Sequence, residues 1–136
     1  MIKYTEDLET KIPKIDMQHK ELFKRINDVI ALGVKSVSKE ETDKTFKLLE
    51  EYIDTHFRDE EELQRVSGYD KIEWHKGQHK MFADAYKVLK NEYYKNGPSA
   101  AFTLQLSKSI IDWIVKHIKE VDVELGRFLN AKNLKQ

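Results

Sequence analysis

The chain has 136 residues, with 24 basic and 24 acidic side chains, so its formal net charge is zero. This balance argues against nucleic acid or an anionic membrane as a partner. The chain has no cysteine, which excludes disulfides, thiolate chemistry and cysteine-held clusters. No apolar run is long enough to cross a bilayer, and the first residues lack a signal-peptide core. We therefore expect a cytoplasmic protein without membrane insertion.

The secondary structure is expected to be helical throughout, because the chain has only two prolines and five glycines. Residues 1–15 include Pro13 and lack a helical stripe, so they predict an extended arm. Apolar residues then recur at three- and four-residue spacing in four segments, at about 17–36, 39–66, 71–95 and 99–119. Residues 123–136 are expected to form a short tail, with one further helical turn around 123–129.

Capping signals support these boundaries. A side chain that can cap a helix stands before each segment: Asp16, Ser38, Asp70 and Ser99. Glu41 and Glu73 follow the second and third caps by three residues, the spacing of a capping box. Long helices with short connections make antiparallel neighbours. The predicted fold is therefore all-α, an up-down-up-down four-helix bundle in a single domain spanning residues 1–136.

The five histidines of the chain are expected to meet at one end of this bundle. They stand early in the first and third helices and late in the second and fourth: His19, His56, His75, His79 and His117. Each continues the apolar stripe of its own helix, so each points into the bundle. Buried imidazole nitrogens without partners cost ~1–3 kcal/mol each. A metal ion would accept their lone pairs directly.

Two carboxylates have the right phase to join the histidines. Glu60 follows His56 by four residues, so both project from one helix face, while the rest of the acidic run 59–62 is expected to be solvated. Asp122 follows His117 by five residues, which are about 140° apart on a regular helix because each residue advances about 100°. For these two to meet, the fourth helix must end or bulge between them.

Five imidazoles and two carboxylates are too many ligands for one transition-metal ion. Two ions bridged by Glu60 and Asp122 would use all seven, and imidazole suits Zn, Cu, Fe and Ni. Di-iron sites in four-helix bundles are usually rich in Glu. A site rich in neutral histidine should instead favour Fe(II) and reversible binding of dioxygen over oxygenation.

Four motifs stand in order on the four predicted helices: IDMQH at 15–19, HFRDEE at 56–61, HKGQH at 75–79 and WIVKHIKEVD at 113–122. Together they resemble the hemerythrin family, in particular its single-domain bacterial members, over roughly residues 4–128. The resemblance implies a centre of two Fe ions (Fe2+/Fe3+). It implies His75, His79 and His117 on a coordinatively full iron, His19 and His56 on an iron with an open position, and Glu60, Asp122 and an oxo or hydroxo group as bridges.

The open iron is where the resemblance would place dioxygen or a small anion. Ile114 lies one turn before His117 and Phe23 one turn after His19, and with Trp113 they are expected to form an apolar oxygen pocket. Three positions depart from the family pattern, in which Trp, Met and Pro are common: Tyr4, Gln64 and Asp70. None of the three removes an expected ligand.

The expected function is reversible dioxygen binding for storage, delivery or scavenging, rather than an enzymatic activity. Two alternatives stay open: an oxygen or redox sensor acting through a partner, and a di-iron enzyme that processes peroxide, nitric oxide or Fe(II). We expect no attached output module, and the sequence offers no obvious general acid or redox relay. A metal-free bundle is the remaining alternative, and the clustering of five core histidines argues against it. The sequence identifies no protein partner.

Overall fold

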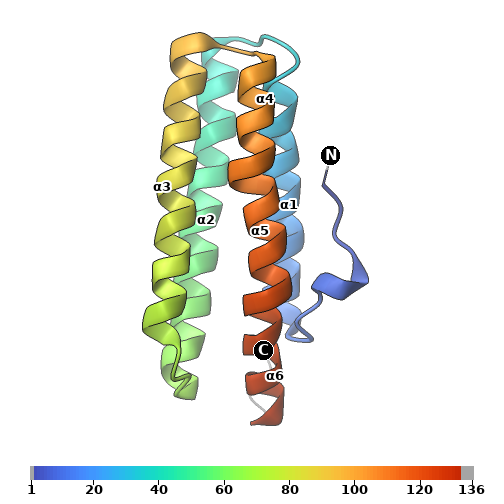
Figure 1. Ribbon diagram of the computed structural model, residues 1–136, viewed down its shortest axis with the longest axis vertical. Helices are drawn as coiled ribbons and strands as arrows, with labels where there is room; N and C mark the ends of the chain where they lie inside the picture. The colour runs from blue at the N-terminus through green and yellow to red at the C-terminus, as the bar shows by residue number, and fades with distance from the viewer. Residues whose placement is uncertain (1, 133–136) are drawn as a thin grey trace.

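A computed structural model describes residues 2–132 of the chain. Three long helices, α1 (Pro13–Leu32), α2 (Lys39–Ser67) and α3 (Ile72–Asn96), run side by side with a composite fourth helix (Figure 1). The α1–α2 and α3–α4 connections lie at the top of Figure 1, and the α2–α3 turn lies at the bottom. The described residues contain no strand. The all-α, up-down-up-down bundle is therefore confirmed.

The fourth helix consists of five consecutive segments with helical backbone throughout: α4 (Ala100–Leu106), the π-helical η2 (Ser107–Ile111), α5 (Asp112–His117), the π-helical η3 (Ile118–Asp122) and α6 (Val123–Ala131). The predicted tail is thus mostly a nine-residue helix that extends the bundle, and the last part of it, 133–136, lies outside the described residues. No helix in the described part of the chain combines the length and apolarity that a membrane crossing requires.

The first helix begins earlier than expected, and the arm is correspondingly shorter. Pro13 occupies the first turn, where its fixed φ and missing N–H are tolerated, and a short 3₁₀ turn, η1 (Glu6–Leu8), lies in the arm. Asp16 does not cap the helix as predicted. Its carboxylate lies inside α1 and accepts hydrogen bonds from the Thr10 backbone N–H and the Tyr4 hydroxyl, at 2.8 and 3.0 Å. Asp16 therefore fastens the arm to the bundle.

The other helix ends follow the sequence signals unevenly. Ser38 and Ser99 accept hydrogen bonds from backbone N–H groups three residues on, as predicted for N-caps. Gly68 ends α2 with φ of 76°, in the left-handed region that glycine tolerates. Asp70 does not cap α3: the helix starts one residue later than a cap there requires, and Lys71 at its start makes no side-chain cap.

Two apolar clusters fill the interior, and a polar layer lies between them. The larger cluster occupies most of the bundle and contains large side chains from all four helices, including Phe46, Leu49, Phe82, Leu89 and Leu106. The smaller one lies toward the α2–α3 turn and contains Ile12, Ile15, Tyr69, Leu125 and Leu129. The arm crosses α6 at Gly126, where a Cβ would come within 2.2 Å of the Thr10 carbonyl oxygen. Glycine is therefore required for this contact.

Candidate metal centre

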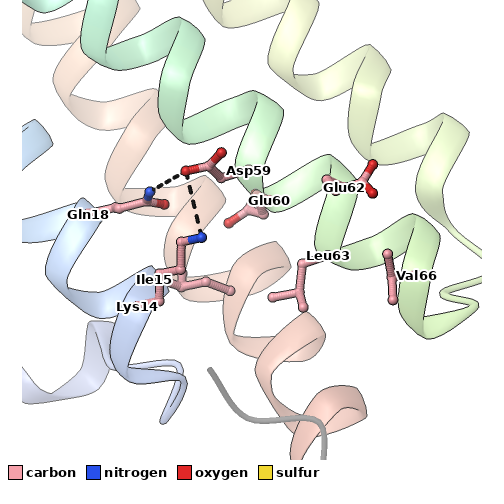
Figure 2. Close-up of a pocket in the computed structure, with 8 residues that line it drawn as sticks. All are labelled: Lys14, Ile15, Gln18, Asp59, Glu60, Glu62, Leu63 and Val66. Carbon is pink, nitrogen blue, oxygen red and sulfur yellow. Dashed lines mark hydrogen bonds and ion pairs between the residues drawn. The ribbon is translucent and has the colours of Figure 1, made fainter.

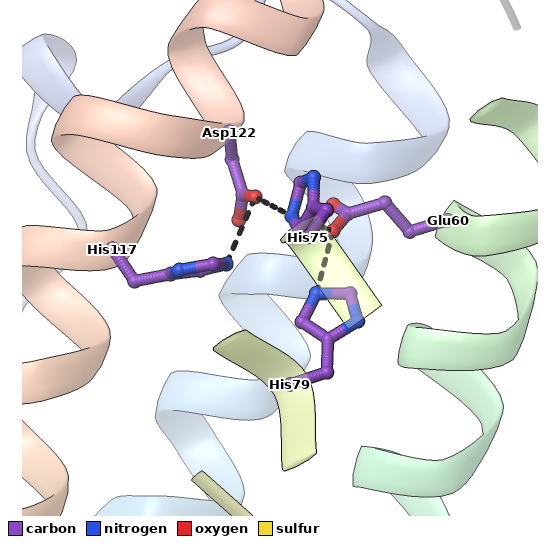
Figure 3. A group of neighbouring side chains, drawn as sticks. All are labelled: Glu60, His75, His79, His117 and Asp122. Carbon is purple, nitrogen blue, oxygen red and sulfur yellow. Dashed lines mark hydrogen bonds and ion pairs between the residues drawn. The ribbon is translucent and has the colours of Figure 1, made fainter. Parts of the chain in front are cut away.

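All seven residues predicted as metal ligands lie together in the polar layer. Each of them is at most 4% exposed: His19, His56, Glu60, His75, His79, His117 and Asp122. Residues from α1, α2, α3 and the fourth helix thus meet in one buried place, and Figure 3 shows five of them turned toward one another. Such dense burial of ionisable groups is costly unless the groups are paired or bind metal.

The π-helical turn η3 brings Asp122 to this place. His117 ends α5 and Asp122 ends η3, and their side chains approach to 3.2 Å between Nε2 and Oδ1. A π-helical turn bonds residues five apart, so it aligns two positions that a regular α-helix would turn away from each other. The spacing predicted that the fourth helix must end or bulge here, and the structure shows that it bulges.

The seven residues form two groups whose ligand atoms lie within 4.8 Å of one another. The larger group, which we call the three-histidine group, is Glu60, His75, His79, His117 and Asp122. The smaller, the two-histidine group, is His19, His56, Glu60 and Asp122. Both carboxylates belong to both groups.

Each shared carboxylate presents one oxygen to each group. Glu60 Oε1 lies 3.1 and 3.0 Å from the Nε2 atoms of His75 and His79, while Oε2 lies 3.6 Å from that of His56. Asp122 Oδ1 lies 2.9 Å from His75 Nε2, and its Oδ2 lies 3.0 Å from His19 Nε2. The two carboxylates therefore lie between the two sets of imidazoles.

Several buried atoms of the site have no hydrogen-bond partner among residues 2–132. Both ring nitrogens of His19 and of His117 are unpaired, although their Nε2 atoms lie close to Asp122, and Glu60 Oε2 is also unpaired. A protein interior seldom leaves such atoms unsatisfied, because each costs ~1–3 kcal/mol. A metal ion binds to nitrogen and oxygen lone pairs that lie close together and accept no hydrogen bond. The residues present therefore fit bound metal.

The electrostatics of the site keep its carboxylates ionised. Burial raises the pKa of Glu60 and of Asp122, and the Asp122 carboxylate further raises that of Glu60, but the surrounding imidazoles outweigh these effects and hold both pKa values below their usual range. Burial lowers the pKa of His56 to about 4, which favours its neutral, metal-binding form. Burial acts the same way on His75, but hydrogen bonds to both carboxylates raise its pKa to about 10.

Three of the five imidazoles have a partner at Nδ1, the ring nitrogen directed away from the shared carboxylates of Glu60 and Asp122. The pairs are His56 with Gln18 at 2.8 Å, His79 with Glu61 at 2.8 Å and His75 with Gln64 at 2.7 Å. Partners at this position fix the ring orientation and the tautomer of a metal-ligating histidine. Phe57 adds a second restraint, since its ring stacks on that of His79 at 3.8 Å between centroids.

A crevice between α1 and α2 reaches one of the shared carboxylates from the surface (Figure 2). Glu60 lies at its inner end, and Ile15 and Leu63 form part of its apolar wall. At the rim, the Gln18 amide donates a hydrogen bond to Asp59 at 2.9 Å. Because Gln18 also contacts His56, a chain of polar contacts joins that buried ring to the rim of the crevice.

Sequence reasoning missed the three Nδ1 partners. Glu61 was expected to be solvated with the rest of its acidic run, but it is only partly exposed and contacts His79; of that run, Glu62 remains well exposed. Gln18 and Gln64 are both buried polar residues at apolar-stripe positions: Gln18 follows Ile15 by three residues, and Gln64 follows Glu60 by four. A glutamine at a position of the buried apolar stripe was therefore the sequence signal that could have indicated these two histidine partners.

The three residues expected to form the oxygen pocket occupy different environments. Ile114 and Phe23 are buried, at 1% and 3% exposed, and both belong to the larger apolar cluster. Trp113 is partly buried and stacks on the His117 ring, with centroids 4.6 Å apart and planes 11° from parallel. It also lines a surface crevice beside that ring. Trp113 is therefore in contact with a ring of the three-histidine group.

The fold and the buried histidine–carboxylate layer define a helical-bundle protein of the metal-binding class. Comparison with protein families agrees: the family described as "Hemerythrin HHE cation binding domain" matches residues 10–129. The chain belongs to the hemerythrin family, a family of non-haem di-iron proteins that bind oxygen rather than act as enzymes. The resemblance drawn from the four motifs is thereby confirmed.

Individual relatives cover nearly the whole chain. A myohemerythrin from Theromyzon tessulatum is 32% identical over 120 residues, which are 88% of this chain and 87% of that protein. A bacteriohemerythrin from Methylococcus capsulatus is 29% identical over 90% of this chain and 91% of its own length. Another from Clostridium acetobutylicum is 27% identical over 91% of this chain and 98% of its own length.

Proposed function

We propose that the seven buried residues hold two iron ions and that the protein binds dioxygen reversibly, for storage, delivery or scavenging. The three-histidine group would bind one iron and the two-histidine group the other, with Glu60 and Asp122 bridging both. Two iron ions held there would supply the reversible two-electron chemistry that dioxygen binding requires. The small molecule that the protein takes up is neutral, so the proposal requires no charged substrate site.

One observation carries the proposal: each shared carboxylate turns its two oxygens to different groups. Glu60 Oε1 faces His75 and His79, whereas its Oε2 lies nearer to His56. A carboxylate that bound a single ion would turn both oxygens toward that ion, or one oxygen toward the ion and the other toward a hydrogen-bond donor. Two carboxylates divided in this way support a pair of bridged ions.

The unequal size of the groups supports binding of a small molecule at one ion only. The three-histidine group supplies one more imidazole than the two-histidine group, while both share the same carboxylates. The ion held by His19 and His56 would therefore have the free position, where dioxygen or a small anion could bind. His117, on whose ring Trp113 stacks, would bind the other ion, which has no free position.

The surrounding chain would keep water away from this position. The larger apolar cluster covers the layer on one side, and the smaller cluster with the arm covers it on the other. Ile114 and Phe23 are buried members of the larger cluster, three residues from His117 and four residues from His19. Water or a solvated anion would occupy the free position and compete with dioxygen for it, so an apolar cover would favour reversible binding.

Optical spectroscopy on iron-loaded protein tests the proposal. After anaerobic loading with Fe(II), air should produce a visible absorption band, and removal of dioxygen under argon should abolish it over repeated cycles. A protein that takes up iron but oxidises once and does not recover would contradict reversible binding. Rapid turnover of added peroxide or nitric oxide would instead favour an enzyme.

A further inference from the structure

Gln64, near the end of α2, is a fully buried polar residue that contacts an expected ligand. Its side-chain amide lies 2.7 Å from Nδ1 of His75. A buried amide beside a ligating ring is a polar contact that an apolar Met side chain would supply only weakly, because a thioether is a weak acceptor.

The chemistry of His75 decides which end of the amide it needs. A neutral imidazole that binds metal through Nε2 carries its proton on Nδ1, and so does an imidazolium held between the two carboxylates. In either state Nδ1 donates a hydrogen bond and requires an acceptor. The only acceptor that the Gln64 side chain offers is its carbonyl oxygen, Oε1.

The surroundings of Gln64 allow that oxygen to face the ring. With Nε2 directed at His75, Oε1 is buried and has no hydrogen-bond partner in the described part of the chain. A half-turn of the amide exchanges the two atoms without changing the shape of the side chain. This rotation would break no hydrogen bond of Oε1, and it would bring Oε1 into hydrogen-bond distance of the Nδ1–H of His75.

We propose that Gln64 is a positioning residue for the three-histidine group: its Oε1 accepts the Nδ1–H of His75, which fixes the ring with Nε2 toward the metal and makes it a stronger ligand. The proposal rests on the metal-binding function proposed above. It predicts an effect on one ion only, because His75 belongs to the three-histidine group and is absent from the two-histidine group. Loss of such a partner typically weakens metal binding 10–100-fold.

Zn(II) titration of the metal-free protein, with a competing chelator, tests this assignment. We expect Gln64→Met to weaken one of two binding steps by about tenfold and to leave the other unchanged. Gln64→Glu, which keeps the shape and supplies a stronger acceptor, should bind at least as tightly as the wild type. Ser67→Ala is the matched control, because Ser67 is buried in the same helix end and its hydroxyl donates a hydrogen bond to the Gln64 backbone carbonyl.

Nuclear magnetic resonance of the Zn(II)-loaded wild type, with ¹⁵N-labelled histidine, provides a second readout that needs no variant to fold. The Nδ1–H of His75 should resonate downfield of that of His117, whose Nδ1 has no partner. Equal shifts, or equal weakening of both steps in Gln64→Met, would overturn the role of Gln64. A wild type that fails to bind two ions would overturn the metal-binding proposal as well, so the two failures are distinguishable.

Discussion

The α1–α2 and α3–α4 connections lie at one end of the bundle and the α2–α3 turn lies at the other (Figure 1). Toward the first end the interior is apolar, whereas toward the second it contains a layer of ionisable side chains. Phe46 and Leu49 represent the first region, each buried among other apolar groups. Burial of one such side chain contributes ~1.5–3 kcal/mol. In the second region burial of charge costs free energy, which ion pairing and bound metal must offset.

The contrast indicates a division of labour within one fold. The apolar region should fold the bundle without metal, and the folded bundle then holds the seven ligands of the polar layer close together. The metal site should accordingly depend on the fold more than the fold depends on the metal. Four predictions test this comparison, in order of decreasing effect on stability.

The largest effect is expected from Phe46→Ala, in the apolar region. Phe46 is fully buried, and its ring packs against those of Tyr86 and Tyr93. Its truncation should lower the free energy of unfolding by ~3–5 kcal/mol, equally in metal-free and metal-loaded protein. Urea unfolding measures the loss, and metal analysis should still find the wild-type content. A loss confined to the metal-loaded form would break the comparison.

Removal of metal should have the next largest effect, confined to the other region. A bound ion stabilises the folded state by ~2 kcal/mol when its concentration exceeds its dissociation constant about thirtyfold, so two ions contribute ~4 kcal/mol. The metal-free protein should retain its helical circular dichroism. Hydrogen exchange should accelerate around Glu60, His75 and Asp122 and stay slow around Leu49 and Leu89. Uniform acceleration would show that the two regions are not separate.

Ile114→Ala probes the boundary between the regions. We expect a loss of ~2–4 kcal/mol in unfolding free energy, from a cavity at a fully packed position. The iron should also oxidise irreversibly faster in air, because water gains access to the polar layer. Ile114→Leu, of similar volume, is the control and should cost less than ~1.5 kcal/mol. If both variants oxidise at the same rate, Ile114 does not cover the site.

The smallest effect on stability is expected from removing one histidine. His19→Ala should deplete mainly the ion of the two-histidine group, and His79→Ala mainly that of the three-histidine group. Each should lose roughly half of the metal-dependent gain in stability. Glu60→Ala, in contrast, should lose both ions, because Glu60 belongs to both groups. Equal partial loss in all three variants, measured by metal analysis, would contradict the division into two groups.

The sequence predicted what depends on periodicity and spacing. The five inward-facing histidines and Glu60 lie on apolar stripes. The five-residue step from His117 to Asp122 predicted that the fourth helix ends or bulges there, and η3 supplies a bulge. It failed where tertiary contacts decide. Asp16 resembles an N-cap, but the crossing of the arm makes it a partner of Thr10 and Tyr4 instead.

The partners of the histidine rings were also beyond the spacing argument. Glu61 lies in a run of acidic residues whose pattern suggests solvent, and only the approach of α3 turns its carboxylate toward His79. Gln18 and His56 are 38 residues apart, so their contact depends on how α1 packs against α2. Local patterns determine which face of a helix is buried, whereas side-chain pairs depend on the packing between helices.

Magnetic susceptibility of the oxidised, iron-loaded protein tests the central claim most directly, since only ions that share bridging ligands couple strongly. The two groups of this site share Glu60 and Asp122. The account predicts about two irons per chain with antiferromagnetic coupling between them. One iron per chain, or two irons that behave as independent paramagnets, would contradict it.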